Sequence, residues 1–332
     1  MIPHSKPWIT NEDLAAVEAC LRSNMISCGK KTEEFEAKFA SYTGARFAKT
    51  FSSGTAALLA ALKALDVTQG DEIIFPTYVC HEVMDAVLAT GAKPVLCDIS
   101  SNWVMHTEQV SKHITQKSKA IIVVHTLGIR ADVKDFLPFG IPLIEDCSQC
   151  LDNVTGKTGC MSVYSFNSTK CLATGEGGAV TTSDKTIFDK LCKQHEASGA
   201  RMSDLQASLG LSQLNRYDEM LSARKDVAEH YFSEINETLT NKFSQLKDRS
   251  IFYRFLLTTS KSFDQLRSEM ESKGVAVRKG VDALLHKKYS YSGSEFPNAS
   301  EAFETTVSIP IYPSLNATDR TKITETINSI LR

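Results

Sequence analysis

Apolar residues in the first two thirds of the chain follow two alternating patterns. Short continuous apolar runs are separated by stretches in which apolar residues recur at every third or fourth position. The runs predict β-strands and the stretches predict helices. Strands are expected at residues 72–75, 94–98, 120–125 and 142–146, with further short strands ending near residue 51, around residue 164 and from residue 179. Continuous apolar strands that alternate with helices indicate a mostly parallel sheet covered by helices on both faces, so we expect an α/β fold.

Two helices are predicted before the first strand. Thr10 and Asp13 have the spacing of a capping pair, and apolar residues follow at helical spacing to about residue 23. A second cap at Thr32 predicts a helix that ends near Gly44.

The pattern changes after residue 200. A long helical stretch is predicted from Ser203 to about Ile235, and a helix of that length often connects two domains. Strands are then expected at 251–257 and 275–278, with helices at 263–273 and from Thr318. We therefore predict a large domain at residues 1–222, including the N-terminal segment, and a small C-terminal α/β domain at residues 223–332.

Composition narrows the range of partners. The chain has 332 residues and a formal net charge of −2, without the basic excess that is typical of nucleic-acid-binding proteins. It lacks the apolar core of a signal peptide and an apolar run long enough to cross a bilayer, so we expect a cytoplasmic protein with small-molecule partners. Nine cysteines without close paired spacing fit reduced thiols better than disulfides or a metal site.

Several residues could carry chemistry, although each also has an ordinary structural interpretation. Lys170 lies among small and hydroxyl residues; it is either a surface charge or an amine that can form a Schiff base with an aldehyde. The turn at 53–56 opens a helix and is either a simple N-cap or a phosphate site. Asp146, Gln149 and Tyr78 follow strand ends, where parallel sheets collect their ligands. Each could equally be a cap or a core residue.

These candidate residues belong to an ordered set of sequence motifs. The sequence contains TEEFE (32–36) after Gly29, SGTAAL (53–58), GDEI (70–73), PTY (76–78), GAKPV (91–95), VH (124–125), EDCSQ (145–149), SF (165–166) before Lys170, GEGG (175–178), RMSD (201–204) and IPIYP (309–313). In this order, over nearly the whole chain, it resembles the DegT/StrS nucleotide-sugar aminotransferases. These are fold type I transferases that depend on pyridoxal 5'-phosphate.

The resemblance implies a role for each matching residue. Lys170 would hold pyridoxal phosphate covalently and later move a proton. Asp146 would pair with the pyridinium nitrogen, Gln149 would hydrogen-bond the 3-oxygen, and Tyr78 would stack on the ring. The cofactor phosphate and its surroundings would be contacted by a further group of residues, namely Gly54, Thr55, Ala56, Ser165 and Asn167.

The implied reaction is a two-stage transamination. L-glutamate would give its amino group to the cofactor, leaving 2-oxoglutarate, and the pyridoxamine 5'-phosphate form would aminate a nucleotide-linked keto-sugar. We expect the C4 ketone of a UDP-linked 4-keto-6-deoxy hexose in bacterial glycan synthesis, with a 3-keto-sugar on dTDP or GDP as the alternative. Lys170 argues against the dehydratase branch of the family, in which a histidine holds this position.

Two features depart from the family pattern. The connection before Arg201 is short, and relatives use this region to reach the partner's active site in a homodimer, which we also expect here. Asn167 stands where a histidine is common. Arg201, His286 and Tyr312 are candidate substrate contacts. Two other functions stay open: a non-catalytic sugar-nucleotide sensor, and a different pyridoxal phosphate enzyme such as a lyase or decarboxylase.

Overall fold

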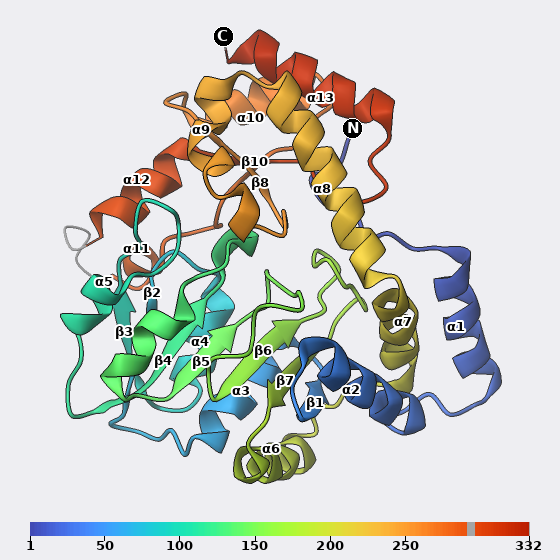
Figure 1. The fold of residues 1–332 in the computed structure, drawn as a ribbon, viewed down its shortest axis with the longest axis vertical. Coiled ribbons are helices and arrows are strands. Elements are labelled where there is room, and N and C mark those ends of the chain that lie inside the picture. The colour runs from blue at the N-terminus through green and yellow to red at the C-terminus, as the bar shows by residue number, and fades with distance from the viewer. Residues whose placement is uncertain (291–295, 332) are drawn as a thin grey trace.

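The computed structural model describes residues 1–290 and 296–331, in which a large sheet and a small sheet form the two ends of an elongated molecule (Figure 1). The large sheet has seven strands in the order β1-β7-β6-β5-β4-β2-β3. Within it, β7 runs antiparallel to both of its neighbours, whereas β3, β2, β4, β5 and β6 pair in parallel. The mostly parallel sheet is therefore confirmed. Its strands are β1 (Phe47–Phe51), β2 (Glu72–Pro76), β3 (Lys93–Cys97), β4 (Ser118–Val124), β5 (Leu143–Asp146), β6 (Met161–Ser165) and β7 (Gly178–Thr182).

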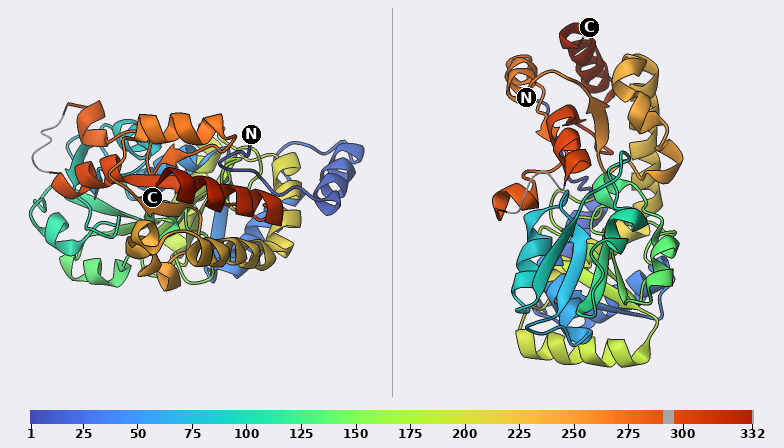
Figure 2. Two further views of the ribbon diagram at one scale, coloured as in Figure 1. Left: turned by 90° about the horizontal axis from the view of Figure 1, so that it is seen from above. Right: turned by 90° about the vertical axis from the view of Figure 1, so that its left-hand side faces the viewer.

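Helices flank this sheet (Figures 1 and 2). α3 packs against β1, β6 and β7, and α4 packs against β3. The helices of this part are α1 (Asn11–Arg22), α2 (Lys30–Thr43), α3 (Gly54–Ala64), α4 (His81–Leu88), α5 (Thr107–Ser111), α6 (Lys185–Ser198) and α7 (Asp204–Asn215), with 3-10 turns η1 (Thr126–Gly128) and η2 (Val133–Phe139). The apolar face of α3 and the continuous apolar runs of the strands supply the core, in which Phe51, Ile74 and Ile122 are fully buried.

The small sheet lies at the other end of the molecule. Its antiparallel order is β8-β10-β9, with β8 (Phe255–Thr258), β9 (Arg278–Lys279) and β10 (Thr306–Ile309). Around it lie α8 (Tyr217–Glu234), α9 (Glu237–Ser244), η3 (Lys247–Arg249), α10 (Phe263–Ser272), α11 (Leu285–Lys288), α12 (Pro297–Thr305) and α13 (Ala317–Ile330). The chain start joins this end, because Ile2 exchanges backbone hydrogen bonds with Gly274 and Ala276, 2.7 and 3.1 Å long. The proposed division near residue 222 lies inside α8 and stays a prediction.

Three predicted elements differ from the structure. The long helix expected from Ser203 is broken at Arg216, whose backbone leaves helical geometry and whose guanidinium donates to Asp13 at 2.6 Å. The strand expected at 251–257 begins only at Phe255, because Phe252 has a φ of 54°. The strand expected at 275–278 shifts to Arg278–Lys279. Patterns of apolar residues do not report such backbone breaks.

The start of α2 also differs from the prediction. Thr32 is not the cap; the helix begins at Lys30, and a carboxylate from a distant helix caps it. Asp204 accepts hydrogen bonds from the backbone N–H groups of Gly29, Lys31 and Thr32, 2.8, 3.2 and 2.9 Å long, and from the Thr32 hydroxyl at 2.7 Å. A carboxylate at a helix N-terminus satisfies free N–H groups and complements the helix dipole. Asp204 therefore ties α7 to α2.

We expect Asp204→Ala to destabilise the protein by about 2–3 kcal/mol at pH 7, because it removes the acceptor of one buried and two half-buried backbone N–H groups and of the Thr32 hydroxyl. Burial raises the pKa of Asp204, but hydrogen bonds from Thr32 and from backbone N–H groups lower it by more, so its net pKa lies below the usual value. Its stabilisation is thus present above about pH 4 and is lost as the pH falls through the lowered pKa.

Urea unfolding of the wild type and of the Asp204→Ala variant at pH 7 and pH 3 checks this. The difference in the free energy of unfolding between the two proteins should be smaller at pH 3 than at pH 7. Asp204→Asn, which keeps one acceptor oxygen but no charge, should have an intermediate free energy of unfolding at pH 7. An equal difference at both pH values would contradict the role of the charge.

Candidate active site

A cavity opens where the carboxyl ends of β5 and β6 meet the N-terminus of α3. Residues from the small-sheet end of the molecule, including Tyr253 and Arg254, close its other side. Of the sequence-predicted site residues, the following line it: Gly54, Thr55, Asp146, Gln149, Ser165, Asn167 and Lys170. Residues separated by more than a hundred positions thus meet at one edge of a parallel sheet, which is where such sheets bind ligands.

The turn before α3 forms one wall of the cavity. Ser53 caps the helix by accepting a hydrogen bond of 3.1 Å from the N–H of Ala56. The preceding N–H groups of a first helical turn have no partner within the helix and suit an anion. Ala56 does not line the cavity and its N–H serves the cap, so this placement does not support a phosphate contact from Ala56.

Close packing shapes this turn. A Cβ added to Gly54 would lie 2.8 Å from the Ser165 Cβ. A Cβ added to Gly178 would lie 2.4 Å from the Ser53 carbonyl oxygen and 2.7 Å from the Gly54 nitrogen. All three distances are shorter than real Cβ contacts, so only glycine allows the turn to lie this close to β6 and β7.

Lys170 lies in the loop between β6 and β7. Its Nζ is 5.4 Å from the centroid of the Tyr253 ring. Burial lowers the pKa of the Lys170 amine, but nearby acidic groups, Tyr253 first among them, raise it by more, so that the net pKa is above the ordinary lysine value. Desolvation alone therefore does not prepare this amine for Schiff-base chemistry, and a ligand that changes the charge around it would have to help.

Asp146 and Gln149 follow the end of β5. The Asp146 side chain is buried, and its Oδ1 accepts a hydrogen bond of 2.9 Å from the N–H of Ser148. Gln149 Oε1 accepts from the N–H of Leu127 at 2.7 Å, which assigns the amide oxygen and leaves the Gln149 NH2 group as a donor. The cavity thus offers a carboxylate and an amide donor on the same side.

Asn167 and Ser165 support the loop that carries Lys170. The Asn167 side chain accepts from the Thr169 N–H at 3.1 Å and donates to Glu176 at 2.8 Å. The Ser165 hydroxyl accepts from the Asn167 N–H at 3.5 Å. Their hydrogen bonds hold the two ends of the loop together, so both residues help to position Lys170.

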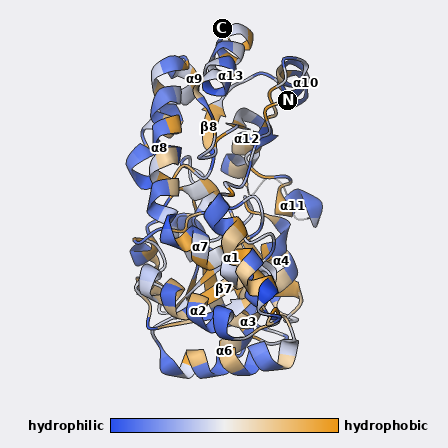
Figure 3. Ribbon diagram, turned by 90° about the vertical axis from the view of Figure 1, so that its right-hand side faces the viewer, coloured by the Kyte–Doolittle hydropathy of each residue, from blue (hydrophilic) through white to orange (hydrophobic). Residues whose placement is uncertain are grey.

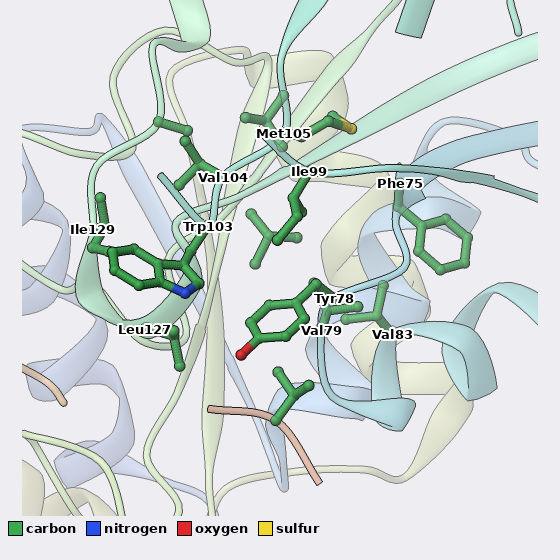
Figure 4. Close-up of a cluster of buried hydrophobic side chains, with 14 of the residues drawn as sticks. Phe75, Tyr78, Val79, Val83, Ile99, Trp103, Val104, Met105, Leu127 and Ile129 are labelled. Carbon is green, nitrogen blue, oxygen red and sulfur yellow. The ribbon is translucent and has the colours of Figure 1, made fainter. Parts of the chain in front are cut away.

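Tyr78 lies in the core and does not line the cavity. Its side chain points among Trp103, Leu127 and Ile99 (Figure 4), and it is fully buried. Burial raises the pKa of its phenol. This placement does not support stacking on a cofactor ring, and it matches the core alternative that the sequence left open.

The three candidate substrate residues also lie away from the cavity. Arg201 is exposed. His286 is buried, with its Nδ1 2.9 Å from the Thr77 hydroxyl and its ring stacked on Phe296 at 4.5 Å. Tyr312 is buried as well. The structure does not bring these residues to the cavity, and their placement does not support a substrate contact.

Other residues that line the cavity were not predicted. Cys80 lies at the start of α4, Tyr253 and Arg254 lie just before β8, and Arg278 lies in β9. Arg254 interrupts the apolar run at 251–257, and that interruption was the available signal. The run was interpreted as one strand, which hid the turn that directs these side chains to the cavity.

The short connection before Arg201 contacts the turn directly. The Ala200 carbonyl accepts a hydrogen bond of 3.0 Å from the N–H of Ser52. The segment therefore packs on the back of the turn that precedes α3.

The residues of the cavity fit pyridoxal phosphate. The glycine cradle at the start of α3 suits a phosphate, the Asp146 carboxylate suits a protonated ring nitrogen, the free NH2 of Gln149 suits a phenolate oxygen, and Lys170 suits the aldehyde.

Comparison with known proteins agrees with this fit. Residues 7–328 match the DegT/DnrJ/EryC1/StrS aminotransferase family. The chain belongs to this family. It is 30% identical over 379 residues to the spore coat polysaccharide biosynthesis protein SpsC of Bacillus subtilis, with 100% of this chain and 97% of SpsC covered. It is 31% identical over 360 residues to GDP-perosamine synthase of Escherichia coli O157:H7, with 98% of each covered.

A solved structure shares the fold. Ntda from Bacillus subtilis, described with bound cofactor PMP, has a TM-score of 0.88 at 22% identity, over 97% of this chain and 82% of that one. The predicted family, fold class and aminotransferase activity are confirmed by the family match and the fold, and the predicted cofactor agrees with this neighbour. The alignment with SpsC is 47 positions longer than this chain (379 against 332), so SpsC has residues that this chain lacks. In the described part of the chain, none of the helices could span a membrane.

We expect Gly178→Ala to weaken cofactor binding at least tenfold. The new methyl group would meet the backbone of Ser53 and Gly54, which must then move away from β7. The overpacked contact lies between β7 and the Ser53–Gly54 backbone, and such overpacking also costs about 1–3 kcal/mol of stability. Equilibrium dialysis of pyridoxal phosphate and urea unfolding measure both effects, and wild-type cofactor affinity in the variant would contradict the role assigned to this contact.

Proposed function

We propose that this enzyme transfers an amino group from L-glutamate to the C4 ketone of a 4-keto-6-deoxy hexose carried by a nucleoside diphosphate. The observation that carries the proposal is the convergence of Lys170, Asp146 and the start of α3 on one cavity. Pyridoxal phosphate, when bound, supplies the aldehyde that captures amines and the ring that accepts electrons. The protein supplies positions and protons.

Each residue has a separate task. Asp146 would pair with the ring nitrogen, and its burial would strengthen that pairing. Gln149 would donate an N–H to the ring's 3-oxygen, and the first turn of α3 would bind the phosphate. The Lys170 amine would carry a proton once it is neutral, and the ionised Tyr253 phenolate, whose negative charge raises the Lys170 pKa, would be the base that takes up the amine's proton.

The names of two relatives support one choice of sugar nucleotide. GDP-perosamine synthases of Escherichia coli O157:H7 and Vibrio cholerae match this chain at 31% and 34% identity, over 98% and 71% of its length. Their name favours a GDP-linked sugar, whereas the sequence-based expectation was UDP. We therefore propose GDP first, with UDP and dTDP as the alternatives. Amination at C3 is the main alternative in position.

The experiment that tests the proposal follows the cofactor by its visible spectrum. Wild-type protein loaded with pyridoxal phosphate should show a yellow band, which L-glutamate bleaches while 2-oxoglutarate is released. Lys170→Ala should lose this response, because the covalent link and the proton carrier are both removed. Lys157→Ala, at an exposed lysine, is the matched control and should behave as the wild type.

The glutamate-treated enzyme is then mixed with 4-keto-6-deoxy hexoses on GDP, UDP and dTDP. Return of the yellow band with one of them, and an amino-sugar product by mass spectrometry, identifies the acceptor. Bleaching without any acceptor in the panel would overturn the sugar assignment. A protein that does not take up the cofactor would favour the sensor, and decarboxylation or elimination from an amino acid would favour a lyase.

We also propose that the enzyme is a homodimer. The support comes from α1 and the segment after it, which lie at the edge of the molecule (Figures 1 and 3). Leu14, Leu21 and Met25 there are 61, 52 and 72% exposed, although they are large and apolar. Exposed apolar patches of this kind are typical of interfaces.

Sedimentation of the wild type should therefore give a mass of two chains of 36.6 kDa each. The double variant Leu14→Glu with Leu21→Glu should sediment as one chain while it keeps its helical circular dichroism. A wild-type protein that sediments as a single chain at micromolar concentration would overturn the dimer.

A further inference from the structure

We propose that Arg254, whose guanidinium packs on the Tyr253 ring, binds a carboxylate of the amino-group donor. This inference rests on the proposed function, since it names the group that recognises the donor in the same cavity. Both residues line the cavity and neither belongs to a motif that identified the family.

The backbone before β8 directs these two side chains. Phe252 has a φ of 54°, a left-handed conformation that is strained in a residue other than glycine. The buried Arg224 of α8 donates to the carbonyls of Phe252 and Tyr253, at 3.2 and 3.5 Å. Gly128 packs against the same loop, where an added Cβ would lie 2.7 Å from the Tyr253 Cβ. A strained loop held from two sides is typical of functional positions.

The Arg254 guanidinium keeps one edge available. Its Nη1 donates to His4 Nδ1 at 2.6 Å and to the Ser5 hydroxyl at 3.3 Å. Burial and the nearby Arg254 charge lower the pKa of His4 well below its usual value, so His4 is neutral. Its Nδ1 accepts from Arg254, and its Nε2–H donates to the Ser308 hydroxyl at 2.9 Å.

The remaining edge consists of Nε and Nη2. Nε is buried and has no hydrogen-bond partner, and within residues 1–290 and 296–331 neither a partner for Nη2 nor a carboxylate paired with Arg254 is present. Glu82, Glu176 and Asp282 line the same cavity without forming an ion pair with Arg254. Two parallel N–H groups on a guanidinium match a carboxylate or a phosphate. A buried, unpaired Nε is costly unless a ligand completes it.

Position favours the carboxylate of the donor over the phosphates of the nucleotide. The Arg254 Cζ lies 4.9 Å from the centroid of the Tyr253 ring, and Lys170 Nζ lies 5.4 Å from the same centroid. The donor's amino group must reach the neighbourhood of Lys170, and in an α-amino acid a carboxylate is attached to the adjacent carbon. A nucleoside diphosphate is separated from the reacting ketone by the sugar ring, and the exposed Arg278 at the mouth is better placed for it.

The test uses cofactor-loaded full-length protein and calorimetric titration with glutarate, a dicarboxylate that cannot react. Parallel titrations use UDP and GDP. Arg254→Gln should weaken glutarate binding at least tenfold and leave UDP and GDP binding within twofold of the wild type. Arg254→Lys keeps the charge without the paired N–H groups and should also lose most of the glutarate affinity. Arg267→Gln, on the surface of α10, is the control for a general loss of charge.

Three results would overturn the inference. The first is unchanged glutarate binding in both Arg254 variants. The second is weaker binding of UDP and GDP alone, which would make Arg254 a phosphate ligand, and the third is an equal loss of affinity for glutarate, UDP and GDP. Should Arg254→Gln not fold, Arg254→Lys decides by the same criteria.

The inference and the proposed function can fail separately. Arg254-dependent glutarate binding in an enzyme that aminates none of the keto-sugars supports the inference and removes the proposed acceptor. Efficient amination of a keto-sugar from L-glutamate, with unchanged glutarate binding in the Arg254 variants, supports the proposed function and overturns the inference.

Discussion

The contact between Gly178 and the Ser53–Gly54 peptide is the constraint on which the site depends. β7 hydrogen-bonds to β1 on one side and to β6 on the other. β1 leads into the turn before α3, and β6 leads into the loop that carries Lys170. The distance between an anion bound at the helix start and the lysine amine is therefore set by backbone packing, in which a single methyl group has no room.

Charge, rather than desolvation alone, sets the pKa of Lys170. Lys170 is buried, yet Tyr253, Cys80 and Asp146 together raise its pKa. In return, the pKa of the Tyr253 phenol is lowered by the positive charges of Lys170 and Arg254, despite its burial. Lys170, Arg254 and Tyr253 therefore interact electrostatically around the Tyr253 ring. A ligand that adds or removes a charge near this ring shifts the pKa values of Lys170 and Tyr253.

The sequence predicted most of the large sheet and the part of the site that belongs to it. Gly54, Asp146 and Lys170 follow apolar strands, and the carboxyl ends of parallel strands meet in space. Tyr78 also follows a strand but turns into the core, and the local pattern gives no sign of the side chain's direction. Arg254 was missed because its position depends on a left-handed residue. His286 and Tyr312 were carried over from the family pattern, which does not report burial; both are buried here, and their substrate contacts stay predictions.

The attachment of the first residues has a consequence for how the site forms. Ile2 pairs with Gly274 and Ala276, and His4 holds Arg254 and contacts Ser308. Residues 2–4 can therefore reach their places only after residues 274–308 have left the ribosome. Domains generally fold as they emerge, N-terminal parts first. Here the large sheet can assemble early, but the part of the cavity wall that contains Arg254 closes only after residues 274–308 have emerged.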